Sequence, residues 1–167
     1  LTDWTGGGIT IKANASLAIA AAAAALLLLA SSLPSKIVVR VLASFVAVIG
    51  GSTLLEHVFA WDLGIDTLLF DEPPGAAATA APNRMGPPAA TSLLATGIAL
   101  ALRTCSAPAH RFGSALGLAV LGIGMLSLTG HWYGAETMYT IPRLTGIAAQ
   151  TATMTVALGI GIIASNP

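Results

Sequence analysis

Five long apolar stretches run through the sequence, and they restrict what the chain can fold into. The first, ASLAIAAAAAALLLLASS, has no charged side chain over a length close to the roughly 20 residues that cross a bilayer. A backbone in lipid must satisfy its hydrogen bonds internally, which leaves helices and closed barrels, and the alternating pattern of barrel strands is absent. We therefore predict an all-α polytopic membrane helix bundle with about five transmembrane helices. They cover roughly residues 15–33, 37–57, 89–103, 113–130 and 144–165.

The composition is typical of a membrane protein and argues against several other classes. Hydrophobic residues make up 55% of the chain and charged residues 8%, whereas roughly a quarter of a soluble domain is charged. Seven basic residues balance seven acidic ones, so the chain lacks the excess of positive charge that is typical of nucleic-acid-binding proteins. The single cysteine, Cys105, excludes an internal disulfide and a thiolate metal cluster. We expect the partners to be the lipid bilayer and other membrane subunits or a second copy of the chain.

Basic residues predict the orientation of the chain. Lys36 and Arg40 lie at the junction of the first two apolar stretches, and Arg103, His110 and Arg111 lie at the junction of the third and the fourth. Because cytoplasmic loops retain Lys and Arg, we predict that both loops face the cytoplasm. The N-terminus is then outside and the C-terminus inside the cytoplasmic membrane. We predict that residues 1–14 form an outer lead-in and that residues 15–167 form a single membrane-embedded domain. Within this domain, residues from about 58 to 88 form an outer cap loop.

Acidic residues gather in one segment, LLEHVFAWDLGIDTLLFDE, at residues 54–72. Glu56 falls near the outer end of the second apolar stretch, where an ionisable side chain that faced lipid would be costly. Two interpretations of Glu56 stay open: it belongs to a ligand or proton site, or it accepts hydrogen bonds that tie the helix to an outer loop. For His57 and His131 structural hydrogen bonding is favoured over metal or haem ligation, because two histidines without a ligand spacing are a weak signal. No metal and no cofactor is predicted.

The segment GIDTLLF predicts a short amphipathic helix on the outer surface, with Ile65, Leu68 and Leu69 at helical spacing. We predict that this helix folds over the outer mouth of the bundle, where Arg84 or Arg143 pairs with the nearby carboxylates. Aromatic residues at this end are interpreted as a belt at the headgroup level in preference to a binding cage. The candidate binding residues of this outer cap are Glu56, Trp61, Asp62, Asp66, Arg84, Tyr133, Tyr139 and Arg143.

Small residues recur along the predicted helices and indicate where backbones approach one another. Packing within one chain is favoured over a self-association face, because such patterns are common in membrane bundles. In the last helix, the side that carries Gly146, Gly159 and Gly161 is where two alternative packings would meet the least steric hindrance. The predicted packing glycines are Gly113, Gly117, Gly146, Gly159 and Gly161.

Three segments carry a family resemblance: LLEHVFAWDLGIDTLLF, APNRMGPPAATSLLATGIALAL and HWYGAETMYTIPRLTGIAAQTATMTVALGIGII. Together they resemble the N-terminal membrane input region of many bacterial sensor histidine kinases and diguanylate cyclases, over about residues 45–165. Gln150 stands where that family often has histidine. The resemblance implies a membrane-embedded sensing module whose ligand is generally not established. The first segment matches the family at Glu56, Phe59, Trp61, Asp62, Gly64, Ile65, Asp66, Leu68, Leu69 and Phe70.

The sequence departs from that family at its end, since no PAS, kinase or cyclase signature precedes Pro167. Either such domains were cut off or are disordered, or the module serves without them. No G-x-S-x-G, H-E-x-x-H or P-loop pattern is present, so we expect no enzymatic activity.

Two functions are therefore compared. The first is a non-catalytic sensor-like module that binds a small apolar ligand between its helices, or packs against a partner, and signals through its last helix. The second is an accessory structural subunit that stabilises a larger membrane complex of the respiratory or photosynthetic kind. The resemblance favours the first, and the missing output domain favours the second. We expect the first.

Overall fold

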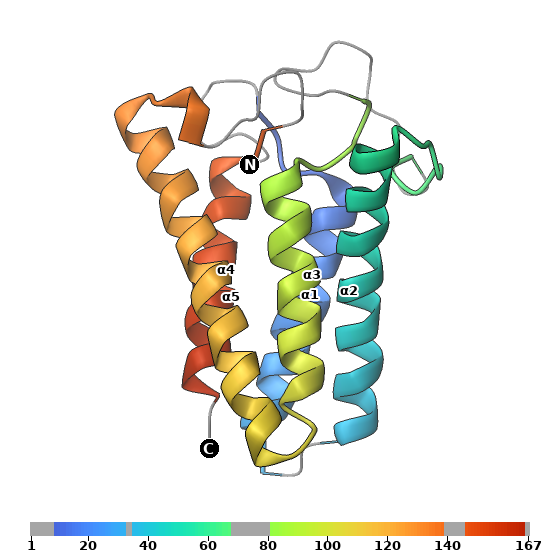
Figure 1. Ribbon diagram of the computed structural model, residues 1–167, viewed down its shortest axis with the longest axis vertical. Coiled ribbons are helices and arrows are strands. Elements are labelled where there is room, and N and C mark those ends of the chain that lie inside the picture. Colours follow the sequence, from blue (N-terminus) through green and yellow to red (C-terminus); the bar gives the residue numbers. More distant parts are fainter. Residues whose placement is uncertain (1–8, 33–34, 68–80, 139–145, 166–167) are drawn as a thin grey trace.

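The structure is a computed structural model, and it describes residues 9–32, 35–67, 81–138 and 146–165. Within these residues the fold is all-helical, with five α-helices and one short 3-10 helix, η1. The helices run roughly along one long axis, and α1 and α5 lie behind a layer formed by α2, α3 and α4 (Figure 1). Their bounds are α1 Ala13–Ala30, α2 Lys36–Phe59, α3 Pro87–Leu102, α4 Ala107–Tyr133, η1 Glu136–Met138 and α5 Ala149–Ala164.

Local sequence explains where these helices begin and end. Proline occupies the first turn of α3 and of α4. Backbone N–H groups in the first turn have no acceptor within the helix, so the N–H that proline lacks costs no helical hydrogen bond there. The helix α3 begins at Pro87, two residues before the third predicted apolar stretch, and α4 begins six residues before its predicted start. At its other end α4 stops at Gly134, whose φ of 65° is the left-handed conformation that glycine adopts readily.

In the described part of the chain, three helices are long and apolar enough to cross a membrane: α1, α2 and, within α4, residues 108–133. The helices α3 and α5 are also apolar but have 16 residues each. At 1.5 Å per residue each spans about 24 Å, which is less than the roughly 30 Å hydrocarbon core of a bilayer. The five predicted apolar stretches all correspond to helices, and the number of membrane crossings stays a prediction.

Glycines bring the backbones of two helix pairs into close contact. A Cβ added to Gly97 of α3 would lie 2.5 Å from the Ala47 nitrogen of α2, and one added to Gly159 of α5 would lie 2.7 Å from the Leu121 nitrogen of α4. No side chain fits at such distances, so the pairs α2–α3 and α4–α5 each interlock. A core of mainly Ala, Val, Leu and Ile fills the space between them.

The predicted surface helix is wrong for the residues that the structure describes, because residues 61–67 are not helical. Gly64 has a φ of 68°, which breaks helical geometry, and the Asp66 side chain points into the protein with 4% of its residue surface exposed. The local backbone conformation is therefore determined by the hydrogen bonds of Asp66 and not by the amphipathic pattern of the neighbouring residues. Residues 68–70 of that predicted helix lie outside the described residues.

Candidate functional site

The end of the bundle at which α2 stops and α3 begins carries a polar cluster around Arg84. Arg84 Nε donates a hydrogen bond to Asp66 Oδ2 at 2.7 Å, and the same nitrogen lies 3.5 Å from Glu56 Oε2. A second guanidinium nitrogen donates to the Trp61 carbonyl at 3.3 Å. The predicted pairing of Arg84 or Arg143 with these carboxylates is confirmed for Arg84, while Arg143 and Tyr139 lie outside the described residues. We call Asn14, Glu56, Asp66, Asn83 and Arg84 the Arg84 cluster.

Asp66 is the centre of this cluster, since it bonds to three residues on two other segments of the chain. Its Oδ1 accepts from Asn14 Nδ2 at 3.0 Å, and its backbone carbonyl accepts from Asn83 Nδ2. Asn83 has a φ of 56°, a conformation that asparagine tolerates better than most residues. The cluster therefore fastens the start of α1 and the segment before α3 to the segment after α2.

Glu56 has no exposed surface, and only one of its two carboxylate oxygens is hydrogen-bonded. Oε1 accepts from the Leu63 amide at 2.9 Å, which ties α2 to the following loop. Oε2 has no hydrogen-bond partner. It lies 3.5 Å from Arg84 Nε, whereas Asp66 Oδ2 lies closer to the same nitrogen, at 2.7 Å. The hydrogen bond from the Leu63 amide therefore fits the second interpretation of Glu56, in which its carboxylate ties the helix to the outer loop.

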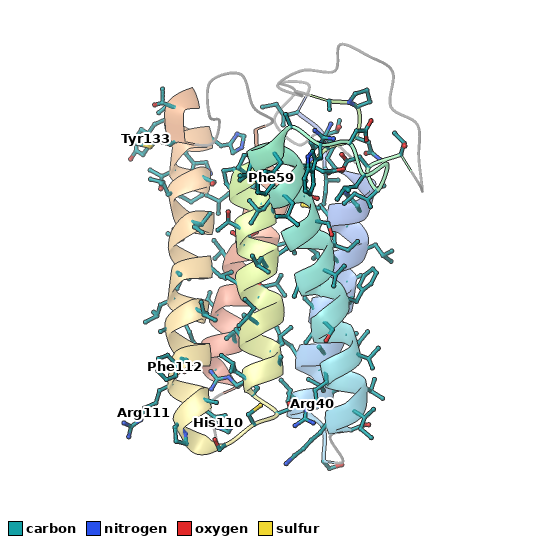
Figure 2. The ribbon with its side chains drawn as sticks, turned by 45° about the vertical axis from the view of Figure 1, so that its right-hand side comes forward. Arg40, Phe59, His110, Arg111, Phe112 and Tyr133 are labelled. Carbon is teal, nitrogen blue, oxygen red and sulfur yellow. The ribbon has the colours of Figure 1, made fainter. Side chains whose placement is uncertain are left out.

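Other candidate residues at this end are not part of the Arg84 cluster. Asp62 lies 3.9 Å from Arg84 but its side chain is 86% exposed, so this contact is weak. Tyr133 is 82% exposed at the end of α4, on the side of the bundle away from Phe59 of α2 (Figure 2). Phe59 and Trp61 stack with ring centroids 4.8 Å apart and are both more than half exposed. Such exposure suits an aromatic belt better than a closed cage.

The two histidines of this end each bond to a backbone carbonyl. His57 Nε2 lies 2.9 Å from the Met85 oxygen, and His131 Nε2 lies 2.9 Å from the Ile147 oxygen. A carbonyl only accepts, so each Nε2 carries the proton and fastens a segment that leads into α3 or α5. Among the described residues, no three His, Cys, Asp or Glu side chains lie together as a metal site.

The opposite end of the bundle holds a buried arginine that sequence reasoning treated only as a topology signal. Arg103 is 6% exposed, and its guanidinium donates to the His110 carbonyl, to Ser114 Oγ and to the Ile162 carbonyl. It therefore joins α3, α4 and α5. Burial lowers the pKa of Arg103, but arginine starts so high that the guanidinium stays charged. The small residues Gly113 and Ser114, about two turns into the next helix, are the sequence signal for this site.

Arg40 and the surface basic residues mark the same end, which we call the Arg103 end. Arg40 Nε donates to Thr104 Oγ1 at 2.7 Å, and this joins α2 to the turn after α3. Arg40, His110 and Arg111 all lie at this end in Figure 2.

A groove between α1 and α5 has a volume of about 530 Å³. Its lining is almost wholly apolar, and its one polar residue, Ser165, lies at the Arg103 end. Ligand pockets in proteins typically have roughly 300–1,000 Å³. The α1/α5 groove, as we call it, is lined by Ile19, Ala23, Leu26, Leu27 and Ala30 of α1 and by Met154, Ala157, Leu158, Gly161, Ala164 and Ser165.

The predicted packing glycines lie on different surfaces. Gly113 is buried beside Ala99 and Arg103, and Gly117 packs against Ile162. Gly159 faces α4, whereas Gly161 faces Leu26 of α1 and lines the groove. Gly146 is buried just before α5. The single face predicted for Gly146, Gly159 and Gly161 is therefore divided, because positions 159 and 161 point to different neighbours on a helix.

Comparison with protein-family models, with curated protein sequences and with solved structures finds no match for this chain.

Proposed function

We propose that this protein is a non-catalytic, membrane-embedded sensor-like module that binds a small apolar ligand and signals through α5. The observation that carries the proposal is the α1/α5 groove, since about half of its lining belongs to α5 itself. A ligand there would touch the helix that leads toward the C-terminus. The resemblance of three sequence segments to bacterial membrane input regions supports the same function.

The packing suggests which surface moves. The α4 and α5 backbones interlock at Gly159, where an added Cβ would meet backbone atoms of Leu121 within 3 Å. Across the groove, the atom nearest to a Cβ on Gly161 is Cδ1 of Leu26, the end of a flexible side chain. A shift of α5 against α1 therefore costs less than a shift against α4. We infer that α4 and α5 move together, with Gly161 on the sliding surface and Gly159 on the fixed one.

The proposed setting is a bacterial cytoplasmic membrane, with the Arg84 end outside and the Arg103 end in the cytoplasm. Of the described basic residues, four belong to the Arg103 end, namely Lys36, Arg40, Arg103 and Arg111, whereas Lys12 and Arg84 lie at the other end together with the acidic residues Glu56, Asp62 and Asp66. This distribution supports the orientation by the positive-inside rule. Five crossings are compatible with the short α3 and α5 where the bilayer thins around them.

A second candidate function is an accessory subunit that stabilises a larger membrane complex. One surface favours it: α2 exposes a row of large apolar side chains on the face turned away from the bundle. A partner helix would cover this row, as lipid also would. The row consists of Ile37, Val41, Val48, Leu55 and Val58.

The two candidates differ in whether α5 moves, and electron paramagnetic resonance distance measurements test this. Spin labels are placed at Leu17→Cys on α1 and Ile160→Cys on α5, both exposed positions, in a Cys105→Ser background and in lipid nanodiscs. The variant Ala157→Phe fills the groove, and Gly122→Phe is its matched control, because no atom lies within 4 Å of a Cβ at Gly122. Decylubiquinone serves as an apolar probe.

A sensor is expected to show two label distances whose populations shift with Ala157→Phe or with the probe, and not with Gly122→Phe. One unchanged distance under all of these conditions would reject the sensor and leave the accessory subunit.

A further inference from the structure

We propose that the α1/α5 groove holds one acyl chain of an anionic phospholipid, with the headgroup beside Arg103 and Lys36. The inference deepens the proposed function, on which it rests for the choice of the groove as the ligand site. It names the class of ligand and the leaflet from which the ligand enters.

The length of the groove fits a chain from a single leaflet. Its lining runs from Met154 to Ser165 on α5 and from Ile19 to Ala30 on α1. Each run rises about 16 Å at 1.5 Å per residue. Half of a roughly 30 Å hydrocarbon core is about 15 Å, which is the depth of one leaflet. The groove thus reaches from the Arg103 end to about the middle of the bilayer.

The chemistry of the lining favours a hydrocarbon chain over a ring that carries polar groups. Ser165 is the one polar lining residue, and its hydroxyl already donates to the Ile162 carbonyl at 2.8 Å. A quinone ring placed deep in the groove would find no hydrogen-bond donor for its oxygens, and ligand sites normally orient such groups with placed polar residues. A saturated chain needs only apolar contact.

Positive charge at the open end of the groove selects the headgroup. The Ile162 carbonyl accepts from both Arg103 and Ser165, so the guanidinium lies next to a residue of the groove. Lys36 begins α2 shortly after Ala30, the last groove residue of α1, and is exposed. Among the described residues no Asp or Glu lies at this end. An anionic headgroup therefore complements this site better than a zwitterionic one.

Native mass spectrometry of the full chain tests the proposal. The protein is reconstituted in nanodiscs with equal parts of phosphatidylglycerol and phosphatidylethanolamine, released into mild detergent, and analysed for the lipids that stay bound. We expect phosphatidylglycerol to be retained in preference. Lys36→Gln should lower that preference about fivefold, the equivalent of about 1 kcal/mol for one basic residue near an anionic lipid. Arg111→Gln, an exposed basic residue of the same end on α4, is the control and should leave it unchanged.

Groove filling gives a second, independent readout. Ala157 and Lys36 are both exposed, so neither substitution disturbs the core. Ala157→Phe should release the bound phosphatidylglycerol, whereas Gly122→Phe should keep it. Equal retention of the two lipids, or equal effects of Lys36→Gln and Arg111→Gln, would overturn the proposal.

Two further outcomes separate this inference from the proposed function. If added decylubiquinone displaces phosphatidylglycerol from the groove and shifts α5, the lipid assignment fails and the sensor function stands. If phosphatidylglycerol is retained selectively while the label distance between α1 and α5 never changes, the sensor function fails and the lipid assignment stands.

Discussion

Arg84 Nε lies 2.7 Å from Asp66 Oδ2, and this ion pair closes the connection between α2 and α3. Asp66 follows α2, and Arg84 lies just before α3, so the pair joins the two ends of the loop that separates these helices. Both side chains are largely buried, with 12% of Arg84 and 5% of Asp66 exposed. The loop is therefore anchored to the bundle at its base.

The first prediction concerns this ion pair. Asp66→Asn leaves Arg84 and Glu56 in place but removes the charge that pairs best with the guanidinium. Because breaking a buried pair leaves one partner uncompensated, we expect the free energy of unfolding to fall by roughly 3 kcal/mol. Unfolding by sodium dodecyl sulfate in mixed micelles measures this. Asp62→Asn, at an exposed carboxylate 3.9 Å away, is the control and should change stability by about 0.5 kcal/mol or less. Equal effects of the two would contradict the central role of Asp66.

The second prediction concerns the interlocked α2–α3 pair. Gly97→Ala places a Cβ 2.5 Å from the Ala47 nitrogen, so the helices must separate. We expect a loss of roughly 1–3 kcal/mol, as for other overpacked sites. Gly122→Ala meets no atom within 4 Å and should stabilise α4 by about 0.5–1 kcal/mol through helix propensity. The same micelle unfolding assay compares them. A Gly97→Ala protein as stable as the parent would show that α2 and α3 are farther apart.

The third prediction concerns Gln150, which is 2% exposed and whose amide oxygen and nitrogen both lack hydrogen-bond partners. Burying an unsatisfied amide is costly, so Gln150→Met, which keeps the unbranched shape, should raise the free energy of unfolding by roughly 1 kcal/mol. Thr96→Val tests the same rule at a hydroxyl that also lacks a partner. A loss of stability in Gln150→Met would mean that the amide has a partner in the membrane-bound protein.

The fourth prediction concerns Arg103. Arg103→Gln removes charged donors from the His110 and Ile162 carbonyls and from Ser114, so the ends of α3, α4 and α5 lose a common partner. Since hydrogen bonds to a charged group contribute about 1.5–3 kcal/mol each, we expect a loss of at least roughly 2 kcal/mol. Hydrogen exchange should then increase first in the last turn of α5. Arg111→Gln should leave both stability and exchange unchanged, because Arg111 is exposed on α4.

The sequence by itself determined that the described fold is all-helical and where its five α-helices lie to within a few residues, with the start of α4 displaced by six. The reason is that apolar length and helix-start prolines act locally: a run such as that of α1 has no other way to satisfy its backbone in lipid. For the partner of the carboxylates the sequence offered Arg84 or Arg143, and the structure shows the contact of Arg84 with Asp66. The surface helix was wrong for the opposite reason, since the hydrogen bonds of Asp66 to Asn14 and Arg84 outweigh the local amphipathic pattern.

Only the tertiary structure decided which helices meet and what lies between them. Gly159 and Gly161 are two positions apart, and nothing local assigns one to α4 and the other to α1. The role of Arg103 as a link among three helices likewise depends on carbonyls distant in sequence, such as that of Ile162. The α1/α5 groove joins the first helix to the last one. Such a hollow depends on how side chains from distant segments fill space, and a linear pattern of apolar residues carries no information about the volume they leave empty.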